Sequence, residues 1–232
     1  MKGHLRLYAI TLEQPVSQGL SASALVKWTK SGRTVKELLL GGIHSQVPTG
    51  QKKWQAHYPT DVNGWASRWI GAKQCTQEVR LKAFQFKILH NILPTNKKLH
   101  KMGYRNNPRC SYCRNEDTIP HAFCNCKKVK EIWECFQRLF TNIEGVTMEP
   151  LNPETILFGL KNANNSTIIK KWNYLILFIK HTIYACKYGA KVSISWKGIL
   201  ESLKYRFRIL KYLSQVAPDR HTFYWEKWMQ QL

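Results

Sequence analysis

The chain has 232 residues, of which 44% are hydrophobic and 12% aromatic, and its formal net charge is +22. This length and apolar content allow a sizeable core and exclude a wholly disordered polypeptide. Thirty-six Lys and Arg residues against fourteen Asp and Glu favour a polyanionic partner, either nucleic acid or an acidic membrane surface.

The first third of the chain has the weakest pattern, and we expect a poorly defined N-terminal segment over residues 1–75. Residues 25–40 have the composition of a short helix, and the glycines and proline within 41–50 predict a loop after it. Trp65 and Trp69 lie four positions apart, which indicates one face of a further helix.

The segment from Thr76 to Pro94 has the period of an amphipathic helix that the proline ends. Its predicted apolar face is formed by Leu81, Phe84, Ile88 and Ile92. Its predicted polar face carries Lys82, Gln85 and Lys87.

Residues 94–110 read as a basic loop that contains no acidic residue. Its cations are Lys97, Lys98, Lys101, Arg105 and Arg109, and the rings of His100 and Tyr104 are interleaved with them. Cations neutralise phosphates and planar rings stack on unpaired bases, so this loop is a candidate nucleic-acid interface. The alternative is a solvated loop whose charges only keep it exposed.

A Cys/His cluster follows the loop: Cys110, Cys113, His121 and Cys126 form the pattern C-x2-C-x7-H-x4-C. Three thiolates and one imidazole at such spacings are typical of a tetrahedral structural Zn²⁺ site. All four positions are filled by protein, so the ion would fold the loop between two helices and leave no room for a substrate.

Two alternatives to this ligand set stay open on spacing alone. Cys124 lies two positions before Cys126 and is able to replace it as the fourth ligand. A redox C-x-x-C motif is the other competitor, but no βαβ pattern surrounds Cys110 and Cys113.

Three helices are predicted in the rest of the chain. The first runs over 127–140, and a turn-rich linker over 142–153 follows it. The second runs over 166–188 and is apolar nearly all round at 174–179, which predicts a central position. The third runs over 196–214.

The outer face of this last predicted helix is a second candidate nucleic-acid surface. Its cations are Lys197, Lys204, Arg208 and Lys211. Because any amphipathic helix has a charged outer face, a purely solvated face is an equally good interpretation.

These elements predict a mainly α protein with a small zinc-stapled loop module between two helices. The expected parts are the segment 1–75, a helix–zinc module–helix unit over 76–141 and a basic helical part over 154–232. The 174–179 stretch is too short to cross a bilayer, which takes about 20 residues.

Cysteine usage and the N-terminus favour an intracellular protein. Residues 1–12 lack the continuous apolar run of a signal peptide. Four of the seven cysteines lie between 110 and 126 and the others are scattered, which favours a metal site in a reducing compartment.

A continuous likeness to a known family runs through residues 80–135, and a weaker one runs through 154–212. It is carried by the stretch 84–96 with its phrase Asn-Ile-Leu-Pro-Thr, by Leu99–Gly103, by the Cys/His cluster and by the segment Val129–Trp133. These residues resemble the zinc-binding region at the C-terminal end of reverse transcriptases from LINE-type non-LTR retrotransposons.

The resemblance implies that the four metal positions are Cys110, Cys113, His121 and Cys126, in favour of Cys126 over Cys124. It also implies binding of template RNA or target DNA during target-primed reverse transcription, with the polymerase part of the parent element as a further partner. The expected location is the nucleus or a cytoplasmic ribonucleoprotein, and no small-molecule substrate is expected.

The chain departs from the full-length family in its carboxylates. A polymerase needs paired aspartates for two Mg²⁺ ions, whereas the three aspartates here, Asp61, Asp117 and Asp219, are far apart. We therefore expect a non-catalytic accessory domain. The alternatives are a protein-interaction scaffold and a truncated or domesticated remnant of the element.

Overall fold

The computed structural model describes residues 47–59, 62–147, 151–160, 166–190, 193–218 and 224–232. Internal contacts divide the chain into one unit of Met1–Val47 and another of Pro48–Leu232. The helix expected over 25–40 lies outside the described residues. The loop expected over 41–50 is corrected at its end, because a helix begins at Thr49.

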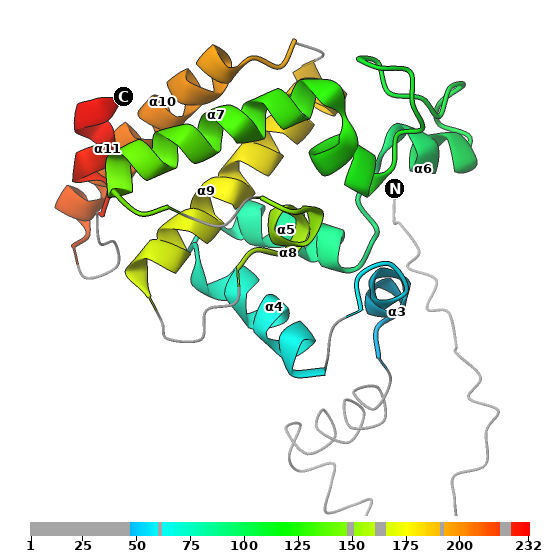
Figure 1. The fold of residues 1–232 in the computed structure, drawn as a ribbon, viewed down its shortest axis with the longest axis horizontal. Helices are drawn as coiled ribbons and strands as arrows, with labels where there is room; N and C mark the ends of the chain where they lie inside the picture. Colours follow the sequence, from blue (N-terminus) through cyan, green and yellow to red (C-terminus); the bar gives the residue numbers. More distant parts are fainter. Residues whose placement is uncertain (1–46, 60–61, 148–150, 161–165, 191–192, 219–223) are drawn as a thin grey trace, which may run out of the picture. The chain divides into compact units, whose positions relative to one another are not determined.

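Helices dominate the described residues (Figure 1). In chain order they are α3 (Thr49–Gln55), α4 (Val62–Gln74), α5 (Val79–Leu89), α6 (Asn96–Lys101), the π-helical turn η1 (His121–Asn125), α7 (Lys127–Glu144), α8 (Pro153–Phe158), α9 (Thr167–Tyr184), the π-helical turn η2 (Ala185–Ala190), α10 (Trp196–Val216) and α11 (Glu226–Gln231). No strand forms within these ranges, and an isolated antiparallel bridge joins Arg109 to Glu116. The prediction of a mainly α protein is confirmed.

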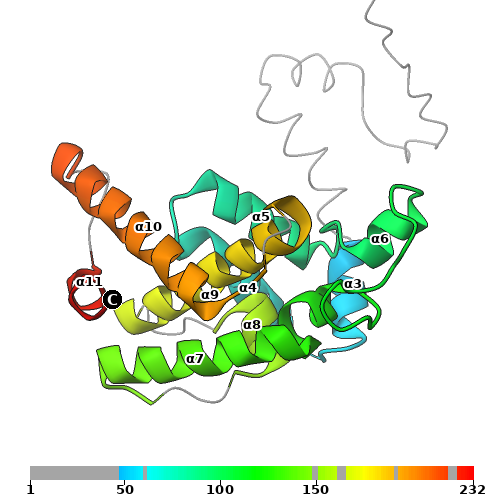
Figure 2. The same ribbon diagram turned by 90° about the horizontal axis from the view of Figure 1, so that it is seen from above.

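Helix α9 occupies the middle of the Pro48–Leu232 unit, between α7 and α5 (Figure 2). Every residue from Trp172 to Leu177 is buried, which fits the nearly all-apolar sequence of this stretch. The helix begins after Ser166, as the sequence predicts, and passes at Ala185 into η2.

An aromatic cluster joins α7, α9, α10 and α11. Phe140 packs edge-on against Trp172, with ring centroids 4.4 Å apart, and lies 5.7 Å from Trp228. Trp225 stacks on Phe207 at 4.8 Å. The linker expected over 142–153 is corrected at both ends, because α7 continues to Glu144 and α8 begins at Pro153. Helices from both of its sides share this core. Truncating such a buried ring to alanine typically costs about 3–5 kcal/mol.

A second cluster joins α3, α4 and α8 and places α3 against the end of α5. The rings of Trp54 and Trp65 lie 5.5 Å and 5.3 Å from that of Phe158. Helix α3 comes so close to α5 that a Cβ atom on Gly50 would lie 2.2 Å from the carbonyl carbon of His90. Only glycine fits this approach.

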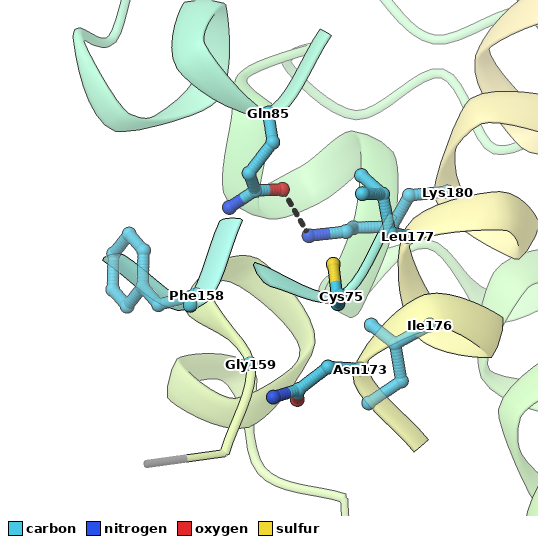
Figure 3. Close-up of a pocket in the computed structure, with 9 residues that line it drawn as sticks. Cys75, Gln85, Phe158, Gly159, Asn173, Ile176, Leu177 and Lys180 are labelled. Atoms are coloured by element: carbon cyan, nitrogen blue, oxygen red, sulfur yellow. Dashed lines mark hydrogen bonds between the residues drawn. The ribbon is translucent and has the colours of Figure 1, made fainter. Parts of the chain in front are cut away.

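Three helices meet at a buried polar group next to a small cavity (Figure 3). Lys180 of α9 donates to Gln85 Oε1 of α5 at 2.7 Å and to the Leu157 carbonyl of α8 at 2.9 Å. Gln85 was expected on the polar face of its helix and is instead buried, because its amide also donates to the Leu157 carbonyl. The cavity of about 20 Å³ has room for a single water.

The end of α5 differs from the prediction in two ways. The helix stops at Leu89, and Asn91 with a φ of 54° turns the chain, so Ile92 is 48% exposed and Leu93 is buried in its place. The stretch predicted as a loop over 94–110 contains α6. Thr95 is the N-cap of this helix. The side-chain amide of Asn96 donates to the Arg109 carbonyl at 3.0 Å and so joins the start of the helix to the segment before Cys110.

We call residues 94–126 the Cys/His lobe, and α4, α5 and α7–α11 with η2 the helical body. The lobe lies at one end of the unit (Figures 1 and 2). Among the described residues, no helix combines the length and the apolar character that a membrane crossing requires.

Candidate metal centre and nucleic-acid interface

The lobe brings together four side chains of the predicted ligand set. The ligand atoms of Cys110, Cys113, His121 and Cys126 all lie within 4.8 Å of one another. Cys126 Sγ is 3.9 Å from both Cys110 Sγ and Cys113 Sγ, and Cys113 Sγ is 3.2 Å from His121 Nε2. A tetrahedral Zn²⁺ at about 2.3 Å from each sulfur sets the sulfurs about 3.8 Å apart. The four residues therefore fit the ion.

A tight turn positions the first two cysteines. The Cys110 amide donates to the Asn115 carbonyl at 2.7 Å, and the Arg114 amide donates to the Cys110 carbonyl at 3.0 Å. Arg114 has a φ of 64°, which reverses the chain directly after Cys113. Both sulfurs consequently point to the same side of the turn, toward His121 and Cys126.

The π-helical turn η1 positions the other two ligands. The Cys126 amide donates to the His121 carbonyl five residues earlier, at 3.1 Å. In an α-helix two residues five apart point about 140° away from each other, because each residue turns the helix by about 100°. The wider turn brings both side chains to one side. Trp133 Nε1 anchors η1 to α7 by donating to the Phe123 carbonyl at 2.6 Å.

Cys124 lies outside the cluster. Its buried thiol donates to the Pro153 carbonyl at 3.8 Å, toward α8. Burial raises the pKa of this thiol to about 12, so Cys124 is a neutral core side chain.

The pKa values of two thiols in the cluster are shifted in opposite directions. The hydrogen bond from Cys126 lowers the pKa of Cys110, and the same hydrogen bond, together with burial and the Cys110 charge, raises the pKa of Cys126. A second thiolate is disfavoured beside the first because like charges repel at this distance. A divalent cation removes that penalty, and this donor set suits one.

A buried ion pair anchors the lobe to the helical body. Lys187 of η2 donates to Asp117 Oδ1 at 2.5 Å, and neither side chain is exposed to solvent. The Tyr188 hydroxyl donates to Asp117 Oδ2 at 2.7 Å, and the backbone N–H of Asn96 donates to the same oxygen at 3.3 Å. Nothing in the local sequence singles out this contact, because its two sides lie seventy residues apart.

The basic residues predicted before the cluster lie on α6 and the turn after it. Lys97, Lys101, Tyr104, Arg105 and Arg109 are exposed, and Lys98 is half-buried. Three of these cations already have partners: Lys97 pairs with Glu116, Lys98 donates to the Asn91 carbonyl, and Arg109 donates to the Arg114 carbonyl.

The sequence-based prediction did not include Lys53 of α3, a further cation beside this group. Burial, and after it the charge of Lys53, lowers the pKa of Lys98, so α3 contributes positive charge to the same surface. The signal was weak, because Lys53 belongs to a segment whose helix was not predicted.

Helix α10 carries the second basic surface, and exposed rings are part of it. Lys197, Arg208 and Lys211 are exposed and Lys204 is half-buried. Sequence reasoning missed Tyr205 and Tyr212, which are 67% and 63% exposed. They lie seven residues apart and therefore on the same face of α10. The two basic sets lie on different parts of the unit, α6 at one end and α10 along another side (Figure 2).

The lobe lies within the part of the chain that is similar to a known family. Residues 46–133 match the model of a family described as zinc-binding in reverse transcriptase. The match contains all four residues of the Cys/His cluster and ends within α7. The predicted resemblance to a reverse transcriptase zinc-binding region is confirmed at this level, and the LINE-type assignment stays a prediction. No curated protein and no solved structure is significantly similar to the chain.

Proposed function

We propose that Pro48–Leu232 is a zinc-stabilised, non-catalytic nucleic-acid-binding module of a LINE-type reverse transcriptase. The observation that carries this proposal is the tetrahedral spacing of the Cys/His cluster inside the stretch that matches the reverse transcriptase family. Such a module would contact template RNA or target DNA during target-primed reverse transcription.

The zinc ion has a structural role in this proposal. Three thiolates and one imidazole complete a tetrahedron, which leaves no position for a substrate or for an activated water. When bound, the ion supplies folding free energy to the lobe, on the order of 10–16 kcal/mol in small zinc modules. Burial of Cys110, His121 and Cys126 protects the site from competing ligands.

Two exposed basic surfaces support the nucleic-acid part of the proposal. Helix α6 and the turn after it present a cluster of cations around Tyr104, which is 75% exposed. Helix α10 exposes Tyr205 and Tyr212 between its cations. Cations with interleaved aromatic rings are typical of single-strand binding surfaces, where backbone charge and base stacking act together.

Metal content and RNA binding test the two parts separately. Native mass spectrometry is expected to detect one zinc per chain, lost in Cys110→Ser and in His121→Ala. Single-stranded RNA is expected to bind with an affinity that falls as salt rises, with a log–log slope of about −0.7 per neutralised phosphate. Absence of binding to RNA and DNA at about 50 mM salt overturns the proposal and favours an acidic protein as the partner.

The α10 tyrosines allow a sharper test of base stacking. Tyr205→Ala with Tyr212→Ala is expected to weaken RNA binding by about 1–3 kcal/mol per stacked base. Val216→Ala is the matched control, because Val216 is also 63% exposed on α10 and has no aromatic ring. Equal affinities of the two variants would remove α10 from the interface.

A further inference from the structure

An open groove of about 930 Å³ separates α5 from η2 and the beginning of α10. This volume lies in the upper part of the range for ligand sites, about 300–1,000 Å³. None of the residues that line it is acidic. Those used below are Arg80, Lys87, His181, Tyr184, Cys186 and Tyr188.

Two unpaired cations line the groove on the α5 side. Arg80 and Lys87 are exposed, and neither side chain forms an ion pair or hydrogen bond with another described residue. They lie seven residues apart on one helical face, which places them about 10.5 Å apart along the axis. Stacked nucleotides advance about 3.4 Å each, so this separation spans about three phosphates.

Aromatic rings line the groove opposite these cations. The Tyr184 and Tyr188 rings lie 4.7 Å apart, and both side chains are half-buried. His181 adds a third ring, and burial together with Arg80 lowers its pKa to about 4, so it is neutral at physiological pH. Neutral flat rings beside free cations offer a base a stacking surface and its phosphate a counter-charge.

The groove is continuous with the Cys/His lobe. The Tyr184 hydroxyl donates to the Pro94 carbonyl at 2.9 Å, two residues before α6 begins. The Tyr188 hydroxyl donates to Asp117 within the lobe. A strand that leaves the groove past Pro94 would therefore reach the cations of α6.

We propose that this groove binds a single-stranded segment of nucleic acid. Its phosphates contact Arg80 and Lys87, and its bases stack on the rings of His181 and Tyr184. The inference rests on the proposed nucleic-acid-binding function and places one strand on the helical body, outside both basic surfaces predicted from the sequence. A preference for single strands follows from the rings, because paired bases do not expose their faces.

A charge-matched pair of double variants tests the groove. Arg80→Ala with Lys87→Ala is expected to lower the affinity for single-stranded RNA about tenfold and to reduce the salt slope by about 1.4, the value for two phosphates. Lys130→Ala with Lys227→Ala removes the same charge from exposed helical positions outside the groove and is expected to leave the slope unchanged. Circular dichroism checks that both variants fold.

Cysteine alkylation gives a second measurement on the unaltered protein. Cys186 lines the groove, and Cys135 on α7 is similarly half-buried and lies outside it. Bound single-stranded RNA is expected to slow the alkylation of Cys186 and not that of Cys135.

The failure of the groove and the failure of the proposed function give different results. If the protein binds RNA but the groove variant keeps the wild-type affinity and slope, and Cys186 stays as reactive as in the free protein, the groove is not the site. If the wild-type protein binds no single strand at about 50 mM salt, the proposed function fails as well.

Discussion

The Cys/His lobe and the helical body are stabilised by different chemistry. The lobe buries sulfur, imidazole and a carboxylate, and every residue from Lys101 to Asn107 is exposed. The body buries aromatic rings from four helices around Trp172. Apolar burial stabilises the body, whereas the lobe, in the proposed function, also depends on a bound zinc ion and on the Asp117–Lys187 anchor. On that proposal, the part of the unit whose order depends on the metal lies at one end.

The largest difference in order between the lobe and the body is expected when one metal ligand is removed. Cys126→Ser is expected to lose the bound zinc and the order of the lobe while the body stays folded, because in the proposed function the ion supplies folding free energy to the lobe. Native mass spectrometry measures the metal content, and hydrogen exchange measures the protection of backbone amides in the lobe and in the body. Cys124→Ser is the matched control and is expected to keep the zinc, since its thiol faces Pro153. Zinc retained in Cys126→Ser but lost in Cys124→Ser would contradict the ligand set.

Breaking the anchor should affect both regions together. Asp117→Asn leaves the Lys187 ammonium buried without a counter-charge, which is expected to cost about 3–5 kcal/mol in the free energy of unfolding. Urea unfolding at constant zinc measures this cost. The double variant Asp117→Asn with Lys187→Met should recover part of it, because no charge then stays buried. A loss below about 1 kcal/mol in the single variant would mean that water reaches the pair.

The pH dependence of stability should come from the body at Lys180. Burial lowers the pKa of Lys180 to about 7, and its two hydrogen-bond acceptors match the two protons of a neutral amine. Between pH 7 and the ordinary lysine pKa the unfolded chain binds more protons, so stability rises with pH. Wild-type protein is expected to gain about 2 kcal/mol from pH 7 to 9.

Urea unfolding at the two pH values checks this gain. Lys180→Met should lose the dependence, whereas Lys130→Met, at an exposed position of α7, should keep it. Equal slopes in both variants would show that another group titrates.

The smallest effect is expected at the surface of the lobe. Lys97 and Glu116 pair at 2.9 Å, but their side chains are 51% and 58% exposed. Glu116→Gln should change the free energy of unfolding by less than about 1 kcal/mol, as solvent screens such pairs. A larger loss in urea unfolding would assign Glu116 a role in closing the turn that holds Cys110.

The helices and ligands that the sequence predicted have local signals. The Cys/His pattern lies within seventeen residues, and α7 and α10 have clear apolar stripes, which bury Val129, Phe136 and Phe207. Helix α6 was missed because six mostly basic residues leave no periodicity to read.

Long-range polar contacts were not predictable. Gln85 meets Lys180 ninety-five positions away, and a local pattern assigns an amide to the surface unless its partner is known. The ion pair between Asp117 and Lys187 was not predictable either, because its two residues are seventy positions apart. The groove residue Arg80 likewise looks like any exposed cation until η2 and α10 are placed opposite it.

The π-helical turn η1 also fixes which changes of chain length the lobe tolerates. One residue inserted between His121 and Cys126 would place them six apart, which in an α-helical turn points them about 120° away from each other and takes Cys126 away from the other sulfurs. The exposed turn over 102–107 holds no ligand, so insertions there leave the metal geometry intact. Among descendants of this sequence, length should therefore vary before Cys110, whereas the segment between His121 and Cys126 should not become longer.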